Sequence, residues 1–175
     1  MSSRSLCRTL IASLAIALPM GTHADDQTVV RERFFNLSLP GKWTGSYDRG
    51  SDSWQYQSAD GREAVTVGIL HRAAGPAFDA IKADFAAYLQ TRRKSEIKLG
   101  GPRLQLGEPE IQERRDAVLA RYSGFDPGKN RRTFTRVIVN QLAAASFFYE
   151  AAGFTAEAFD ARAKVVLGQI GLIGK

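Results

Sequence analysis

The feature that most constrains the fold is a two-residue alternation of side chains in the second half of the chain. In the run TFTRVIV at residues 133–139, Val137 and Val139 fall on one side of an extended backbone and Ile138 falls on the other. Successive side chains of a strand point to opposite faces of its sheet. This run therefore predicts a long β-strand.

Shorter runs with strand character occur on both sides of it, at residues 34–39, 54–57, 64–71, 104–106, 118–122 and 145–151. Turn residues separate most of them, as Asp60-Gly61 does between the second and third runs. Short turns between consecutive strands predict antiparallel pairing. Residues 44–53 are rich in Gly, Ser and Asp, and they predict a loop.

Two segments change from strand spacing to helical spacing. The first follows Pro76 and ends at Gly100-Gly101-Pro102, with an apolar stripe of Phe78, Ile81, Phe85, Tyr88 and Leu89. The second follows a capping Thr155 and is predicted to end at Gly171, with a stripe of Ala156, Phe159, Ala163, Val166 and Ile170. Each stripe has to be buried against a sheet. The sequence predicts an α+β sandwich, an antiparallel sheet covered by two helices, in the order βββ-α-ββββ-α.

The first 24 residues have the order of a secretory signal peptide. Arg4 and Arg8 precede an apolar run at residues 10–18, and Thr22-His23-Ala24 supplies small residues for cleavage. Removal of these 24 of the 175 residues leaves 151, predicted to form one domain at residues 25–175. No later segment is apolar enough to span a membrane. The expected location is the periplasm or the cell exterior.

A family resemblance rests on residues 35–43, FNLSLPGKW, and on the order of the elements that follow. A first strand that ends in Leu-Pro, followed by a Gly and a Trp, resembles the start of PsbP/DcrB-like domains. The resemblance implies an α/β sandwich over nearly the whole mature chain. Members of that family act mostly as binding or assembly modules and share no catalytic set. The resemblance therefore transfers no active-site residue to this chain.

The reactive side chains of the predicted mature domain are few. Cys7 and His23 lie in the predicted signal, which leaves His71 as the one histidine and no thiol. Zinc sites usually need about four ligands led by Cys and His, and neither a Gly-x-Ser-x-Gly elbow nor a phosphate-binding loop is present. We therefore expect no metal and no cofactor. We also expect no nucleic-acid partner, because the net charge of the mature domain is only +4 once the two signal arginines are removed from the +6 of the full chain.

One catalytic alternative stays open, a small envelope hydrolase. It would use His71 or the cluster Glu108, Glu110 and Glu113, which surrounds Pro109. Arg114 and Arg115 follow that cluster and would neutralise it. A charged, solvated strand edge is therefore the favoured interpretation of the glutamates, and a strand-end residue is the favoured interpretation of His71.

Two basic groups and one aromatic pair are the candidate binding residues: Arg92, Arg93 and Lys94; Lys129, Arg131, Arg132 and Arg136; and Trp54 with Tyr56. If the fold joins the basic groups, they could hold an acidic protein or a lipid headgroup. The sequence thus predicts an exported, non-catalytic binding module. Its partner would be another envelope or secreted protein, or a small apolar or anionic ligand held between helix and sheet.

Overall fold

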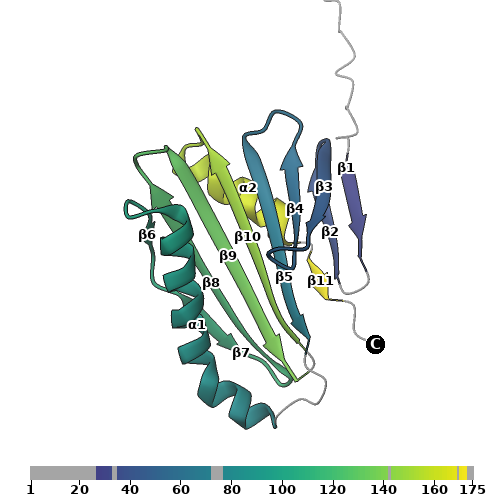
Figure 1. Cartoon of the computed structure of the whole chain (residues 1–175), viewed down its shortest axis with the longest axis vertical. Coiled ribbons are helices and arrows are strands. Elements are labelled where there is room, and N and C mark those ends of the chain that lie inside the picture. The colour runs from purple at the N-terminus through teal and green to yellow at the C-terminus, as the bar shows by residue number, and fades with distance from the viewer. Residues whose placement is uncertain (1–26, 33–34, 72–76, 142, 169, 173–175) are drawn as a thin grey trace, which may run out of the picture.

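The computed structural model describes residues 27–32, 35–71, 77–141, 143–168 and 170–172, and it contains two antiparallel sheets and two helices (Figure 1). The large sheet has the order β3-β4-β5-β10-β9-β8-β6, and β7 also pairs with β8. Its strands are β3 (Trp43–Asp48), β4 (Ser53–Ser58), β5 (Glu63–His71), β6 (Gln105–Leu106), β7 (Glu110–Glu113), β8 (Ala117–Asp126), β9 (Arg131–Asn140) and β10 (Ala143–Ala152). The small sheet consists of β1 (Gln27–Arg31), β2 (Phe35–Pro40) and β11 (Gly171–Leu172).

The two helices lie on opposite faces of the large sheet. Helix α1 (Phe78–Gly100) crosses β8 and β9 on the near face in Figure 1, and α2 (Ala156–Gly168) lies behind β9 and β10. The small sheet packs on the α2 side, where the ring centroid of Phe35 is 6.2 Å from that of Phe147. The molecule therefore has three layers, with the large sheet in the middle.

The alternation along the central strands divides the core into two clusters. Val137 of β9 packs under α1 together with Phe85, whereas Ile138 packs on the α2 side together with Phe147. The large sheet is thus apolar on both faces, as a strand covered by helices on both sides requires. The predicted stripe of α1 is confirmed, because Ile81, Phe85 and Leu89 are buried.

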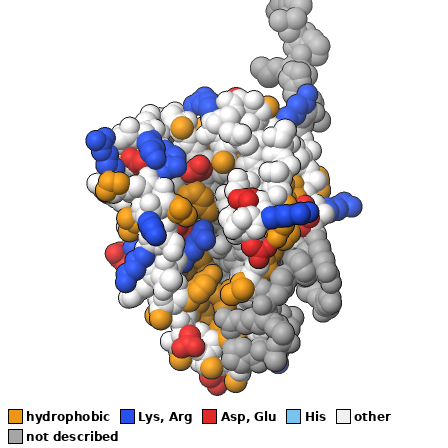
Figure 2. Space-filling view, viewed as in Figure 1, with side chains coloured by type: hydrophobic (Ala, Val, Ile, Leu, Met, Phe, Trp, Pro, Cys, Tyr) orange, Lys and Arg blue, Asp and Glu red, His pale blue; other side chains and the backbone are white. Residues whose placement is uncertain are grey.

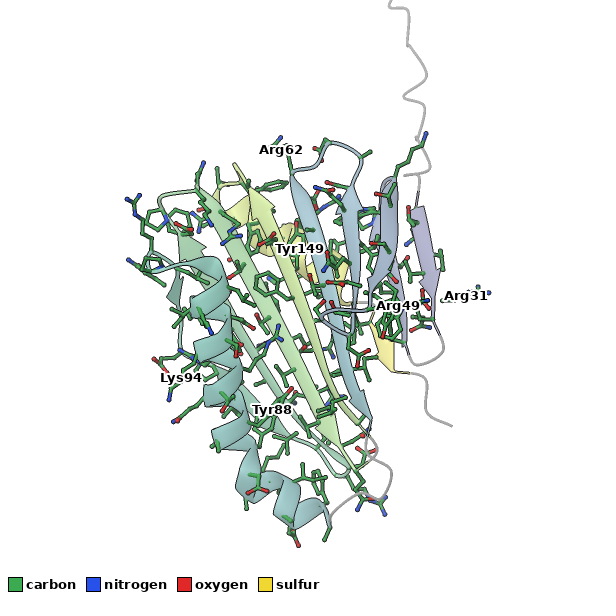
Figure 3. All side chains as sticks on the ribbon, in the orientation of Figure 1. Arg31, Arg49, Arg62, Tyr88, Lys94 and Tyr149 are labelled. Carbon is green, nitrogen blue, oxygen red and sulfur yellow. The ribbon has the colours of Figure 1, made fainter. Side chains whose placement is uncertain are left out.

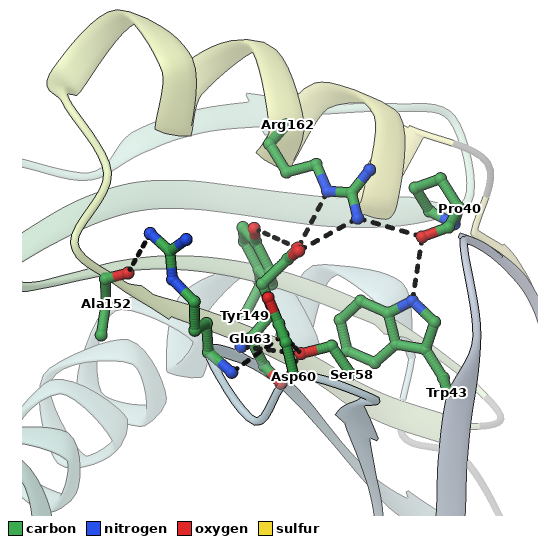
Figure 4. Close-up of polar contacts among 9 residues, drawn as sticks. Pro40, Trp43, Ser58, Asp60, Glu63, Tyr149, Ala152 and Arg162 are labelled. Carbon is green, nitrogen blue, oxygen red and sulfur yellow. Dashed lines mark hydrogen bonds and ion pairs between the residues drawn. The ribbon is translucent and has the colours of Figure 1, made fainter. Parts of the chain in front are cut away.

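Two buried glutamates tie the helices to the sheet. In Figure 4, the guanidinium of Arg162 on α2 donates to both oxygens of Glu63, from Nε at 2.9 Å and from Nη2 at 3.0 Å. Nη2 also donates to the carbonyl of Pro40, and the hydroxyl of Tyr149 donates to Glu63 at 2.9 Å. Because buried carboxylates are stable only when paired, these bonds hold α2 in place.

The matching network beneath α1 is built on Glu96, which is 5% exposed. It accepts hydrogen bonds from Tyr122 at 2.9 Å, from Thr135 and from Arg92. Burial, followed by the charge of Glu96, raises the pKa of Tyr122. The tyrosine thus stays a neutral donor to the carboxylate.

The fold class predicted from the sequence is confirmed, with differences at the edges. Residues 44–53 were expected to form a loop, but 44–48 belong to β3 and only the following four residues form a turn. Strand β3 is a polar edge strand, so it lacks the apolar alternation by which a buried strand is recognised. Helix α2 ends at Gly168 instead of Gly171, which pairs with Asn36 in the small sheet.

The predicted signal at residues 1–24 lies outside the described residues. Within the described part of the chain, no helix has the length and apolar character needed to cross a membrane.

Candidate functional site

A groove of about 580 Å³ lies between α2 and the outer part of the large sheet, on the face opposite α1. Strands β7, β8 and β9 form its floor, and the second half of α2 forms its wall. Apolar side chains line part of it: Leu119, Phe134, Ala163 and Leu167. The four cations Arg114, Arg121, Arg136 and Lys164 line it together with one carboxylate, Glu110, and we call this hollow the basic groove.

Strand register places two of these arginines side by side. Arg121 of β8 is the direct cross-strand partner of Arg136 of β9, on the side that faces α2. Glu110 of β7 is the partner of Arg121 on the other flank. Like charges directly opposite each other destabilise a sheet, so an Arg–Arg pair needs an anion nearby. Glu110 supplies one negative charge to this row.

The hydrogen bonds of the arginines leave positive charge uncompensated. Glu110 Oε2 accepts from Nε of Arg121 at 2.7 Å. Arg136 donates from Nη1 to the carbonyl of Leu167 near the end of α2, at 3.0 Å. Burial lowers the pKa of Arg136, and the charges of Arg114 and Arg121 lower it further. The site therefore has a positive potential that a bound anion would relieve.

The remaining two cations stand at the rim. Arg114 and Lys164 are exposed, and no ion pair or side-chain hydrogen bond involves either of them among the described residues. Their charges are free to meet a ligand. With an apolar floor and a basic rim, the groove can hold a group that is partly apolar and negatively charged.

The structure separates most of the basic residues singled out from the sequence. Arg136 lines the basic groove, and Arg132 lies on the same face, where it covers the ring of Phe125 at 4.6 Å. Lys129 and Arg131 instead reach the carbonyl of Gly100 at the end of α1. The split arises because Arg131 and Arg132 are neighbours on one strand and point to opposite faces.

The first predicted basic group lies along α1, before the helix end that Lys129 and Arg131 contact. Arg92 pairs with the buried Glu96 at 2.9 Å, and Arg93 covers the ring of Tyr122 and donates to the carbonyl of Gly107. Lys94 is exposed. Among the described residues, no hydrogen bond or ion pair joins this group to Lys129 or Arg131, and Arg132 and Arg136 lie on the opposite face of the large sheet.

The aromatic pair packs into the core on the α2 side of the large sheet. Tyr56 is 6% exposed and its hydroxyl donates to Glu32 at 3.3 Å; burial raises its pKa. Trp54 makes an edge contact with Phe35, with a centroid separation of 5.4 Å. Both residues stabilise the packing of the small sheet on the large one.

The glutamate cluster of the hydrolase alternative is divided between two faces. Glu110 pairs with Arg121 on the α2 side, whereas Glu113 pairs with Lys82 of α1 at 3.0 Å. Glu108 is exposed and precedes the strand. Glu110 and Glu113 therefore do not share one reaction centre. His71 is the last residue of β5, and its side chain lies outside the described structure.

Comparison with known proteins identifies the fold. No family model and no curated protein sequence matches the chain. The solution structure of cyanobacterial PsbP (CyanoP) from Synechocystis sp. PCC 6803 is similar, with a TM-score of 0.62 over 90% of this chain and 99% of that one, at 12% sequence identity. The chain has a PsbP-like fold.

A crystal structure from Bacteroides thetaiotaomicron is a weaker match, with a TM-score of 0.40, 11% identity, and coverage of 81% of this chain and 46% of that one. The PsbP-like fold accounts for the order of strands and helices. At 12% identity it does not extend to side-chain roles, so the basic groove is argued from the residues of this chain.

Three of the four groove cations, Arg114, Arg121 and Lys164, were not among the candidates from the sequence. Arg121 lies within the strand run at 118–122, and its register against Arg136 is a tertiary property. Its neighbours Val118, Ala120 and Tyr122 mark the α1 side. That pattern places Arg121 on the opposite face, but it does not show that Lys164 of α2 stands beside it.

In the described part of the chain, no three side chains of the types that hold metals come together.

Proposed function

We propose that the chain is an exported, non-catalytic binding module that holds an acidic, extended segment of a partner protein in the basic groove. The observation that carries this proposal is the Arg121–Arg136 cross-strand pair, flanked by Arg114 and Lys164 and opposed by Glu110. Four cations against one carboxylate suit a negatively charged partner. Export rests on the signal-like residues 1–24, which direct a chain to the periplasm or the exterior.

The edge of the large sheet favours a polypeptide over a small molecule. Strands β6 and β7 both pair with the same side of β8, and no described strand pairs with the other side of β7. Strand β7 also borders the basic groove through Glu110 and Gln112. An extended segment can add to such an edge through backbone hydrogen bonds, while alternate side chains enter the neighbouring groove.

The expected affinity comes from partly desolvated charge pairs and the apolar floor. A hydrogen bond to a charged group contributes roughly 1.5–3 kcal/mol. Two such bonds are enough to separate an acidic segment from a neutral one. Because the rim cations are exposed, binding should weaken as the salt concentration rises.

The experiment uses a ten-residue peptide in which Glu alternates with Val, and a control peptide with Lys in place of Glu. Isothermal titration calorimetry compares the native chain with Arg121→Gln/Lys164→Gln, which removes two groove cations. Arg31→Gln/Arg49→Gln removes two exposed cations far from the groove and is the matched control. We expect the groove variant to bind the acidic peptide about tenfold more weakly, which corresponds to about 1.4 kcal/mol.

Backbone amide NMR shifts locate the peptide, and they should move along β7, β8 and the second half of α2. Equal binding of the Glu and Lys peptides, or equal loss in both double variants, would contradict the proposal. Sodium laurate is a second probe. If laurate moves the groove resonances and the peptide does not, the ligand is a small amphipathic anion and the polypeptide version is wrong.

A further inference from the structure

The C-terminal end of α1 presents aliphatic side chains to solvent. Leu99, in the last turn, is 86% exposed, and Ile97 is 41% exposed. They are not among the buried residues of the helix, which are Ile81, Phe85, Leu89, Glu96 and Gly100. Isolated exposed aliphatic residues are common, but one exposed this completely at a helix end contributes nothing to the core. The residues around Leu99 therefore have to explain its exposure.

Cations surround this end of the helix. Lys94 and Lys98 are exposed on α1, and Arg103 and Lys129 are exposed on the two turns that pack beside it. Lys129 Nζ lies 3.3 Å from the carbonyl of Gly100, which joins the β8–β9 turn to the helix end. We call Lys94, Lys98, Leu99, Arg103 and Lys129 the basic tip.

The two acidic residues near the basic tip are buried, so they do not neutralise its positive charge at the surface. Glu96 is 5% exposed and binds Arg92, and Asp126 is 2% exposed and accepts the backbone N–H of Gly128. Among the described residues, the side chains of Lys94, Lys98 and Arg103 form no ion pair or hydrogen bond. Figure 2 shows Lys and Arg side chains around exposed apolar ones on the α1 side of the molecule.

We propose that the basic tip docks the protein on an anionic membrane surface, with Leu99 inserted at the level of the lipid headgroups. The helix dipole explains why cations suit a helix C-terminus, but it does not explain a solvated leucine among them. A protruding aliphatic side chain fits a deformable lipid surface, whereas protein hot spots fill preformed pockets. Lysine and arginine can pair with lipid phosphates while their stems lie along the apolar boundary.

This surface is independent of the basic groove, because α1 and α2 lie on opposite faces of the large sheet. A protein held by the basic tip would keep the groove open to the aqueous side. Docking on a membrane and binding a partner could therefore occur together. The two sites can also be removed separately by mutation.

The test is co-sedimentation of the full chain with large unilamellar vesicles. One set contains phosphatidylcholine with 30 mol % phosphatidylglycerol, and the other contains phosphatidylcholine alone. Lys98→Gln/Arg103→Gln removes two charges of the basic tip, and Leu99→Asn removes its apolar group. Arg31→Gln/Arg49→Gln removes two charges at the far side of the molecule, as the labels of Figure 3 show. Circular dichroism checks that each variant is folded.

We expect binding to the anionic vesicles only, about tenfold weaker for the charge variant, several-fold weaker for Leu99→Asn and unchanged for the far-side control. Equal binding to both vesicle types would overturn the proposal. Equal binding of all variants would also overturn it, because attachment would then come from another segment such as residues 1–24. If the charge variant weakens binding and Leu99→Asn does not, the docking is purely electrostatic and the proposed insertion of Leu99 is wrong.

Discussion

The bond between Arg162 and Glu63 offers a direct test of how α2 is held in place. Replacing Arg162 with Met keeps the apolar stem of the side chain and removes its guanidinium. Two charge-assisted hydrogen bonds to Glu63 and one to the carbonyl of Pro40 are lost. Glu63, which is 7% exposed, then retains the Tyr149 hydroxyl as its remaining side-chain donor among the described residues.

Removing one partner of a buried ion pair costs about 3–5 kcal/mol, because an uncompensated charge stays buried. Arg162 has 30% of its side chain exposed, so water can replace part of what is lost. We therefore expect Arg162→Met to lower the free energy of unfolding by about 3 kcal/mol. A domain of this size is stable by about 5–15 kcal/mol, so the change is large but leaves a folded protein.

Urea unfolding followed by circular dichroism measures this cost, and a double-mutant cycle with Glu63→Gln assigns it. In the double variant the uncompensated charge is gone, so its loss should be smaller than the sum of the two single losses by about 2 kcal/mol. Arg49→Met, in an exposed turn, is the matched control and should change stability by less than about 0.5 kcal/mol. A loss below about 1 kcal/mol for Arg162→Met, or strict additivity, would refute the role given to this bond.

Three further predictions concern the core and its glycines. Burial, followed by the charge of Glu63, raises the pKa of Tyr149 above that of an unfolded tyrosine, so the stability that neutral Tyr149 contributes is complete below about pH 10 and declines above it. In urea unfolding measured from pH 8 to 12, Tyr149→Phe should make the fall in unfolding free energy above pH 10 less steep by about 1.4 kcal/mol per pH unit. Parallel curves for the native chain and the variant would contradict this. A Cβ at Gly124 would lie 2.5 Å from Thr133 Oγ1 and 3.1 Å from the carbonyl oxygen of Gln105. Gly124→Ala should therefore lower the free energy of unfolding by about 1–3 kcal/mol. An unchanged free energy of unfolding would show that β6 can shift away from β8 at little cost. Within α1, thermal unfolding should show that Phe85→Ala lowers the free energy of unfolding by about 3–5 kcal/mol and Leu99→Ala by less than about 0.5 kcal/mol, because Phe85 is buried and Leu99 is exposed. Similar losses for the two variants would mean that the helix packs on the sheet by another face.

The strands and helices that could be predicted from the sequence are those whose side chains have two distinct environments. The stripe with Ile81 and Phe85 repeats at helical spacing because one side of α1 meets the sheet and the other meets water. Strands β8 and β9 likewise show their alternation in the residue order. Strand β3 was missed because it is polar along most of its length at a sheet edge, where neither face requires apolar residues.

The candidate site could be predicted only in part. Arg136 was among the sequence candidates, but it was grouped with Lys129 and Arg131, which the structure places at the end of α1. Neighbours in the sequence are separated by the pleat of the strand, which sends them to opposite faces. Arg121, fifteen positions before Arg136, is beside it because of the register of β8 and β9.

The residue order alone determined the class of fold, the buried faces of both helices and the scarcity of reactive side chains, because each of these follows from local periodicity or from composition. Tertiary structure alone decided which charges meet. The register of the strands paired Arg121 with Arg136, the packing of α2 brought Lys164 beside them, and the end of α1 placed Leu99 among separate cations. Charge and apolar contact act through space, and distances between residues far apart in a chain are set only when its layers pack.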